Sequence, residues 1–167
     1  MNIYFSIDPE VSGGETRKNL KKLLDFLVRK GHVIYRAPYV LAEDHDQYLL
    51  ENFGVKADDF AGQLKLHLEW IDKSDLLLAD VSNKSEGRSM IVQRALDKPL
   101  MGLSATPIIF IKSRRFDRRF GRIVRGVIQD KKIIYFEYDN IAEVEDHWDD
   151  LVAKFGWSYA KKSIIFN

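Results

Sequence analysis

Short apolar runs alternate along the chain with longer segments in which apolar residues recur every three or four positions. The short runs are typical of buried strands, and the longer pattern is typical of helices that bury one face. The sequence predicts strands at residues 2–6, 32–35, 75–81, 107–111 and 132–136. It predicts helices at residues 15–30, 57–73, 87 onwards, around 116–127 and 140–155. Residues 99–103 compete with 107–111 for the fourth strand.

Two of these helices show clear apolar stripes: Leu20, Leu23, Leu24 and Leu27 in the first, and Phe60, Leu64, Leu68 and Ile71 in the second. Gly31 follows the first helix as a stop signal. The last helix begins at a capping-box pattern of Asn140 and Glu143 and ends before Gly156. These start and stop signals support the predicted boundaries.

The alternation of strands and helices predicts an α/β protein with a mostly parallel sheet. We expect a flavodoxin-like or Rossmann-like three-layer sandwich, and a single domain over residues 1–167, because no repeat or linker interrupts the pattern. Residues 37–56 are the least regular segment, either a lid with a short helix or a surface excursion. Residues 157–167 would add an edge strand or pack at a subunit interface.

The composition excludes several kinds of site. None of the 167 residues is cysteine, so disulfides, thiolate metal sites and cysteine nucleophiles are excluded. Histidines and acids do not follow metal-ligand spacing, and we expect no metal and no cofactor. The net charge of +1 argues against a nucleic-acid or membrane partner. Residues 1–5 lack a signal-peptide pattern, and the apolar runs are too short for a bilayer, so we expect a cytoplasmic protein.

Residues 76–87 carry the clearest functional pattern. An apolar run ends in Asp80 and passes through small polar residues and Gly87 into a predicted helix. A buried parallel strand delivers its carboxyl end into a ligand site in this way. The amides and hydroxyls of such a turn suit an anionic oxygen.

Residues 112–125 are strongly basic: they include Lys112, Arg114, Arg115, Arg118, Arg119, Arg122 and Arg125. This segment would be a phosphate-facing rim, a nucleic-acid contact or a solvated helix face. No aromatic side chain is interleaved on its basic face, which favours the solvated face. Its expected partners are the acidic residues Glu143, Glu145, Asp146, Asp149 and Asp150.

The order of these segments resembles the nucleoside 2-deoxyribosyltransferase superfamily, especially its deoxynucleoside 5′-monophosphate N-glycosidase branch. The resemblance covers residues 2–155 and is carried by residues 3–7 with 13–14, 68–75, 77–87 and 120–126. It implies a nucleoside monophosphate or related small molecule as ligand. It also implies a homodimer, because a second chain completes the sites of the family. The implied chemistry is retaining N-glycosidic cleavage, in which a glutamate attacks the anomeric carbon.

That glutamate ends a Ser-x-Gly-x-Gly-x-Glu pattern in the family. Here Ser85 and Gly87 match, Ser89 replaces the second glycine, and Ile91 occupies the nucleophile position. The acidic partner of the family falls on His67, and a phosphate-site serine falls near Gly121. The resemblance therefore predicts a fold-retaining relative that binds a nucleotide-like ligand, or none, and that is noncatalytic or altered in its activity.

We predict ligand binding by Tyr4, Ser6, Ile7, His67, Asp80, Ser82, Ser85, Glu86 and Gly87, and we assign no catalytic residue. One alternative is an active glycosidase or transferase that uses Glu86 or Asp80 as a displaced nucleophile. Another is an interaction module built on the basic helix. His67 would act as an acid–base group or as a packed histidine, and its place on an apolar helix face favours the packed histidine.

Overall fold

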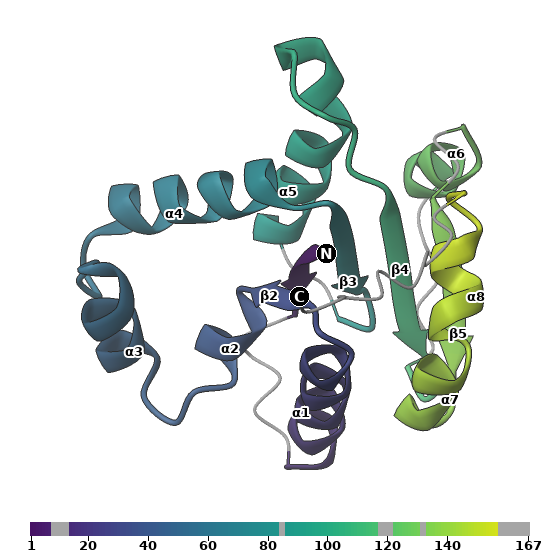
Figure 1. The fold of residues 1–167 in the computed structure, drawn as a ribbon, viewed down its shortest axis with the longest axis horizontal. Coiled ribbons are helices and arrows are strands. Elements are labelled where there is room, and N and C mark those ends of the chain that lie inside the picture. The colour runs from purple at the N-terminus through teal and green to yellow at the C-terminus, as the bar shows by residue number, and fades with distance from the viewer. Residues whose placement is uncertain (8–13, 84–85, 117–121, 131–132, 157–167) are drawn as a thin grey trace, which may run out of the picture.

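In the computed structural model, five strands form one sheet in the order β2-β1-β3-β4-β5 (Figure 1). Every pairing between neighbouring strands is parallel, which confirms the predicted sheet. The structure describes residues 1–7, 14–83, 86–116, 122–130 and 133–156. The strands are β1 (Asn2–Ser6), β2 (Val33–Tyr35), β3 (Leu76–Asp80), β4 (Ile108–Ser113) and β5 (Ile134–Tyr138).

The helices are α1 (Gly14–Arg29), α2 (Ala37–Val40), α3 (His45–Phe53), α4 (Phe60–Lys73), α5 (Glu86–Asp97), α6 (Arg122–Asp130), α7 (Ile141–Asp146) and α8 (Trp148–Ala153). A short 3₁₀ helix, η1 (Lys98–Met101), follows α5. Side chains cap α3, α4 and α7: Asp44 accepts from the Gln47 amide, Asp59 from Gly62 and Asn140 from Ala142. Within the described ranges, no helix is long and apolar enough to cross a bilayer.

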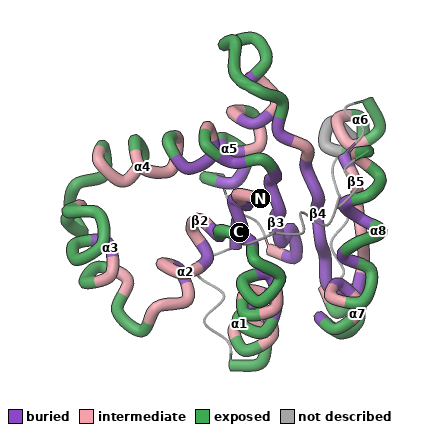
Figure 2. Tube along the Cα trace, viewed as in Figure 1, coloured by how far each residue is buried: buried purple, intermediate pink, exposed green. Residues whose placement is uncertain are grey.

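The sheet separates two apolar layers. In β1, Ile3 and Phe5 face the layer that α1, α7 and α8 cover, whereas Tyr4 faces the layer that α4 and α5 cover. This division follows from the two-residue side-chain period of a strand. The central strands β3 and β4 are buried along their length (Figure 2). The predicted three-layer sandwich is confirmed.

Most predicted elements are present, including the fourth strand at 107–111, but several bounds are corrected. The helix predicted from residue 57 begins at Phe60, and Phe116, predicted to lie in the basic helix, lies in a bend after β4. Residues 99–103 do not form a strand; η1 covers most of them, and Pro99 lies at its start. The fifth strand begins two residues later than predicted, at Ile134. The single helix predicted at 140–155 is divided at His147 into α7 and α8, although its capping box of Asn140 and Glu143 is present. Residues 157–167 and the start of the basic helix at 117–121 lie outside the described residues.

The apolar stripe predicted for α4 is wrong at its first two positions. Phe60 is 77% exposed and Leu64 is 43% exposed, whereas Trp70 and Ile71 are buried. The physical reason is visible in the fold: α3 and the N-terminal half of α4 project away from the sheet, and only the C-terminal half of α4 covers it (Figures 1 and 2). The irregular segment 37–56 contains the two helices α2 and α3.

Candidate functional site

The candidate site lies where β1 and β3 run side by side at the centre of the sheet. Ser6 is paired with Ala79, so the chain leaves both strands at the same edge. In a sheet of order 2-1-3-4-5, the connections from β1 and β3 diverge to opposite faces, and ligands bind at this point. Residues 8–13 after β1 and Lys84 and Ser85 after β3 lie outside the described residues.

Asp80 and Ser82 organise the turn after β3. Oδ1 of Asp80 accepts hydrogen bonds from the Ser82 amide at 2.9 Å and from the Ser82 hydroxyl at 2.5 Å. The Ser82 hydroxyl in turn accepts from the amide of Ser113, at 3.0 Å, at the end of β4. Both side chains are almost fully buried. The Asp80 carboxylate therefore stabilises the turn and links the ends of two strands.

Arg88 supports the same turn from α5. Its guanidinium donates to the backbone carbonyl of Asn83 at 2.6 Å, and the residue is only 8% exposed. The sequence does not indicate this residue, because an arginine in the first turn of a helix carries no distinctive pattern. The predicted site residues Glu86 and Gly87 begin α5 beside it. The turn thus brings a cation close to the start of a helix, an arrangement that suits an anion.

A second cluster lies on the face of the sheet that α4 covers. Oη of Tyr4 is 3.1 Å from Nδ1 of His67, and Nε2 of His67 is 3.2 Å from Nη1 of Arg36. Tyr39 and Trp70 place their rings 6.0 and 5.1 Å from the His67 ring. The structure thus brings Tyr4 and His67 together as a bonded pair, and His67 is a packed histidine with a partner at each nitrogen.

Burial controls the titration of this pair. Burial, with the nearby Arg36 charge as a second cause, lowers the pKa of His67 from 6.5 to about 3. Burial raises the pKa of Tyr4 to about 12, although the Arg36 charge acts in the opposite direction. Both groups are therefore neutral at pH 7. A neutral His67 with both nitrogens bonded is poorly suited to protonate a leaving base.

Arg36, which joins β2 to α2, is a second residue of the site that the sequence did not predict. Its Nη2 donates to the backbone carbonyl of Ile7 at 3.2 Å. Among the described residues, Arg36 is the one non-glycine residue with positive φ, at 69° with ψ of −55°. Arginine after a strand is ordinary in sequence, so no local signal could have identified it. The contact links the end of β1 to the end of β2.

Ile91 faces the sheet from α5. It is 6% exposed and belongs to the same apolar cluster as Tyr4, Ala79 and Val81. This is the residue that the sequence resemblance aligned with an attacking glutamate. Its surroundings are those of a core side chain, and a carboxylate there would lose its hydration without an evident partner in this cluster.

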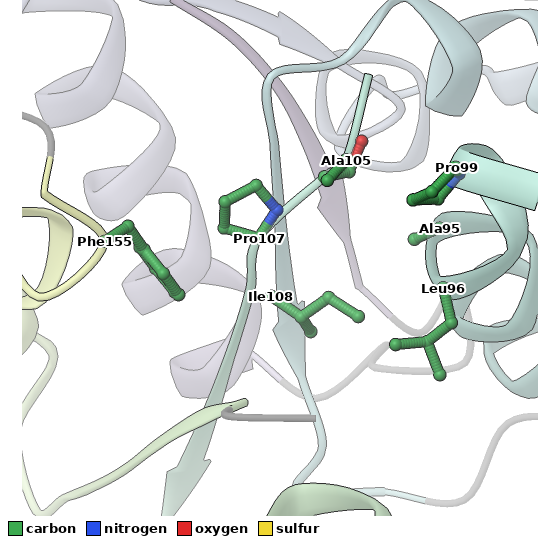
Figure 3. Close-up of a pocket in the computed structure, with 8 residues that line it drawn as sticks. Ala95, Leu96, Pro99, Ala105, Pro107, Ile108 and Phe155 are labelled. Atoms are coloured by element: carbon green, nitrogen blue, oxygen red, sulfur yellow. The ribbon is translucent and has the colours of Figure 1, made fainter. Parts of the chain in front are cut away.

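A pocket of about 250 Å³ lies at the opposite end of the sheet, around the start of β4 (Figure 3). Apolar side chains line most of it, including Leu96, Pro107, Ile108 and Phe155. Thr106 contributes a hydroxyl, which already bonds to Lys98 and to the Ser74 carbonyl. The pocket offers little polar chemistry, so we place the candidate site at the carboxyl ends of the strands.

Comparison of the sequence with protein-family models and with curated proteins finds no match. Solved structures do match. The CMP N-glycosidase BcmB of Clostridium botulinum aligns with a TM-score of 0.57 and 18% identity, over 88% of this chain and 96% of that chain. The chain has the nucleoside 2-deoxyribosyltransferase-like fold. A 2-deoxyribosyltransferase from Bacillus psychrosaccharolyticus aligns over 86% of this chain and 90% of that chain, with a TM-score of 0.51 and 13% identity.

The nucleoside 2-deoxyribosyltransferase-like fold confirms the architecture that the sequence resemblance implied. Both alignments extend over most of each chain, so the likeness includes the whole sheet rather than a single β-α-β unit.

Proposed function

We propose that this chain is a member of the nucleoside 2-deoxyribosyltransferase superfamily that binds a nucleotide or nucleoside phosphate without cleaving its N-glycosidic bond. The observation that carries the proposal is the burial of Ile91 among Tyr4, Ala79 and Val81. An aliphatic side chain has no lone pair with which to attack a sugar carbon. The turn at Asp80–Ser82 and the start of α5 keep the features of an anion site.

Two further observations support a binding role. The Asp80 carboxylate, one of the two possible displaced nucleophiles, bonds within its own turn. His67 is neutral at pH 7 and bonded at both nitrogens, so it does not replace a general acid. We also propose that the protein is a homodimer in which the second chain completes the ligand site, as the resemblance implies.

The basic-segment alternative is less well supported. Arg114 is 2.7 Å from Asp139 and 3.5 Å from Glu143, and Arg115 is 3.0 Å from Glu15. Lys112 pairs with Glu137. These described cations have acidic partners, which favours a solvated, charge-paired surface over a nucleic-acid contact.

The test measures binding and base release on the same sample. Calorimetry with deoxynucleoside 5′-monophosphates should detect binding, and chromatography of the same mixtures should detect no free base above the no-protein control. Release of base at enzymatic rates would contradict the proposal. Asp80→Asn and Glu86→Gln would then show which carboxylate is the nucleophile, with the exposed Asp25→Asn as matched control.

A further inference from the structure

We propose that Arg36 and Tyr4 form an oxyanion-binding site on the face of the sheet covered by α4, apart from the turn after β3. The inference deepens the proposed function, on which it rests for the identity of the ligand. It assigns a phosphate or carboxylate group of that ligand to Arg36, a residue that the sequence did not indicate, beside the predicted site residue Tyr4.

The hydrogen bonds fix those protons. A guanidinium only donates, so Nε2 of His67 must accept the bond from Arg36, at 3.2 Å. A neutral His67 then carries its proton on Nδ1 and donates it to Oη of Tyr4, at 3.1 Å. The hydroxyl proton of Tyr4 is therefore directed elsewhere. Within the described residues it meets no acceptor, although Tyr4 is fully buried.

Arg36 adds further donors to the same place. Of the five guanidinium N–H groups, one reaches His67 and one reaches the Ile7 carbonyl, and the guanidinium also interacts with the Tyr4 hydroxyl. Nε of Arg36 is buried and has no partner in the described part of the chain. Both acceptors are neutral, and no described carboxylate pairs with Arg36. The cluster has more donors than acceptors and one uncompensated positive charge.

A ligand with negative charge and hydrogen-bond acceptors would balance this excess of donors and positive charge. Arg36 is half-buried, and charges withdrawn from water are normally paired. Its buried Nε and the buried Tyr4 hydroxyl are donors of the kind that normally have acceptors. An oxyanion supplies both a negative charge and several lone pairs, and a guanidinium binds phosphate and carboxylate groups through two parallel bonds. The rings of Tyr39 and Trp70 pack against His67, the residue that joins Arg36 to Tyr4, and hold it in place between them.

The backbone supports the same conclusion. Arg36 adopts a φ of 69°, which an L-residue avoids, and it lies between Ile34 and Ala37, whose side chains are buried in the core. Strain of this kind persists where the surrounding structure enforces it, and it is concentrated at binding sites. The strained residue is the one that carries the uncompensated charge.

The direct test titrates the protein with inorganic phosphate and, separately, with acetate, and follows binding by calorimetry. Phosphate should bind about 10- to 100-fold more weakly to Arg36→Met, since a charge-assisted pair is lost. Tyr4→Phe should weaken binding less, and Arg29→Met, an exposed arginine on α1, should leave it unchanged. Acetate binding as tight as phosphate binding would identify a carboxylate-type ligand.

Two results would overturn the proposal: a wild-type protein that binds neither anion, or Arg36→Met that binds phosphate as tightly as wild type. Circular dichroism checks that each variant is folded. If Arg36→Met does not fold, Arg36→Lys replaces it in the test, because lysine retains the positive charge but cannot form a bidentate pair with the anion. It should weaken phosphate binding about 3- to 10-fold, and unchanged affinity in that variant would also overturn the proposal.

A nucleoside monophosphate and its matching nucleoside separate this inference from the proposed function. If wild type binds the monophosphate and Arg36→Met keeps the same preference for it over the nucleoside, the inference fails and the proposed function stands. If inorganic phosphate binds in an Arg36-dependent way but no monophosphate binds, the inference stands and the proposed function fails.

Discussion

At the scale of single residues, Arg36 determines the protonation pattern of its neighbours before any ligand binds. Its bond to Nε2 leaves Nδ1 of His67 as the donor to Tyr4. This arrangement has a conformational cost at Arg36 itself, because its backbone has a φ of 69°. A positive φ costs an L-residue about 1–2 kcal/mol. The residue therefore combines a polar role with a conformational penalty, and the two can be measured separately.

We predict that Arg36→Gly is more stable than Arg36→Met by about 1 kcal/mol, because both lose the guanidinium but only glycine accepts the positive φ without strain. Urea unfolding measures the difference. Gly54 has a φ of 68°, and a Cβ added there would meet open space. Gly54→Ala is therefore a control in the opposite direction, and it should lower the free energy of unfolding by a similar amount. Equal stability of the two Arg36 variants would show that this backbone relaxes.

The sequence could not reveal this cluster, although it contained each member. Tyr4 and His67 were predicted from the family resemblance, but their bond joins residues 63 apart in the chain. Arg36 contacts His67 across 31 residues and belongs to no local pattern. Contacts of this kind depend on how the elements pack, and side-chain periodicity predicts only which face of an element is buried.

At the scale of elements, the C-terminal end of α4 depends on a buried lysine. Nζ of Lys98 donates to the carbonyls of Ile71 and Ser74, at 3.2 and 2.9 Å, and to the Thr106 hydroxyl at 2.5 Å. Lys98 is only 1% exposed, and burial lowers its pKa. The amine joins the end of α4 to the segment before β4.

We predict that Lys98→Met lowers the free energy of unfolding by about 2–3 kcal/mol, because two buried carbonyls lose a charged donor. Chemical denaturation measures the loss. Lys73→Met, at an exposed position of the same helix end, should change stability by less than about 0.5 kcal/mol. A loss in Lys98→Met no larger than in this control would contradict the role assigned to the amine.

Element boundaries were predictable where a local signal existed. The extent of β1 and the capping box at Asn140 were correct because strand alternation and cap chemistry are local. The predicted burial of Phe60 and Leu64 in α4 was wrong, because a helix can continue beyond the edge of the sheet on which it packs. The break at His147 also had no local signal, since Trp148 continues the apolar periodicity into α8.

At the scale of the whole molecule, two histidines make stability depend on pH. Nε2 of His32 accepts a bond from the Trp148 indole at 3.2 Å, and burial, chiefly, lowers the pKa of His32 from 6.5 to about 4. Burial also lowers the pKa of His67 to about 3. Between these values and 6.5, the unfolded chain binds more protons than the folded protein. Stability is therefore complete above about pH 6.5 and falls as the pH falls toward 4.

We predict that His32→Gln reduces this acid sensitivity, because glutamine still offers an acceptor to Trp148 but does not titrate. The free energy of unfolding of wild type should fall by up to about 1.4 kcal/mol per pH unit for each histidine in this window. The slope for His32→Gln should be shallower than that of wild type over the same pH range. Parallel curves for wild type and His32→Gln would contradict the prediction.

The position of β1 between β2 and β3 also bears on how the protein is made. β1 leaves the ribosome before β2 and β3, and its bond from Asn2 to Asp75 spans 73 residues. One edge of β1 therefore has no partner until β3 has been translated, and closing so long a loop is slow. The nascent chain exposes an apolar strand edge during this interval, and an unpaired edge of this kind favours aggregation.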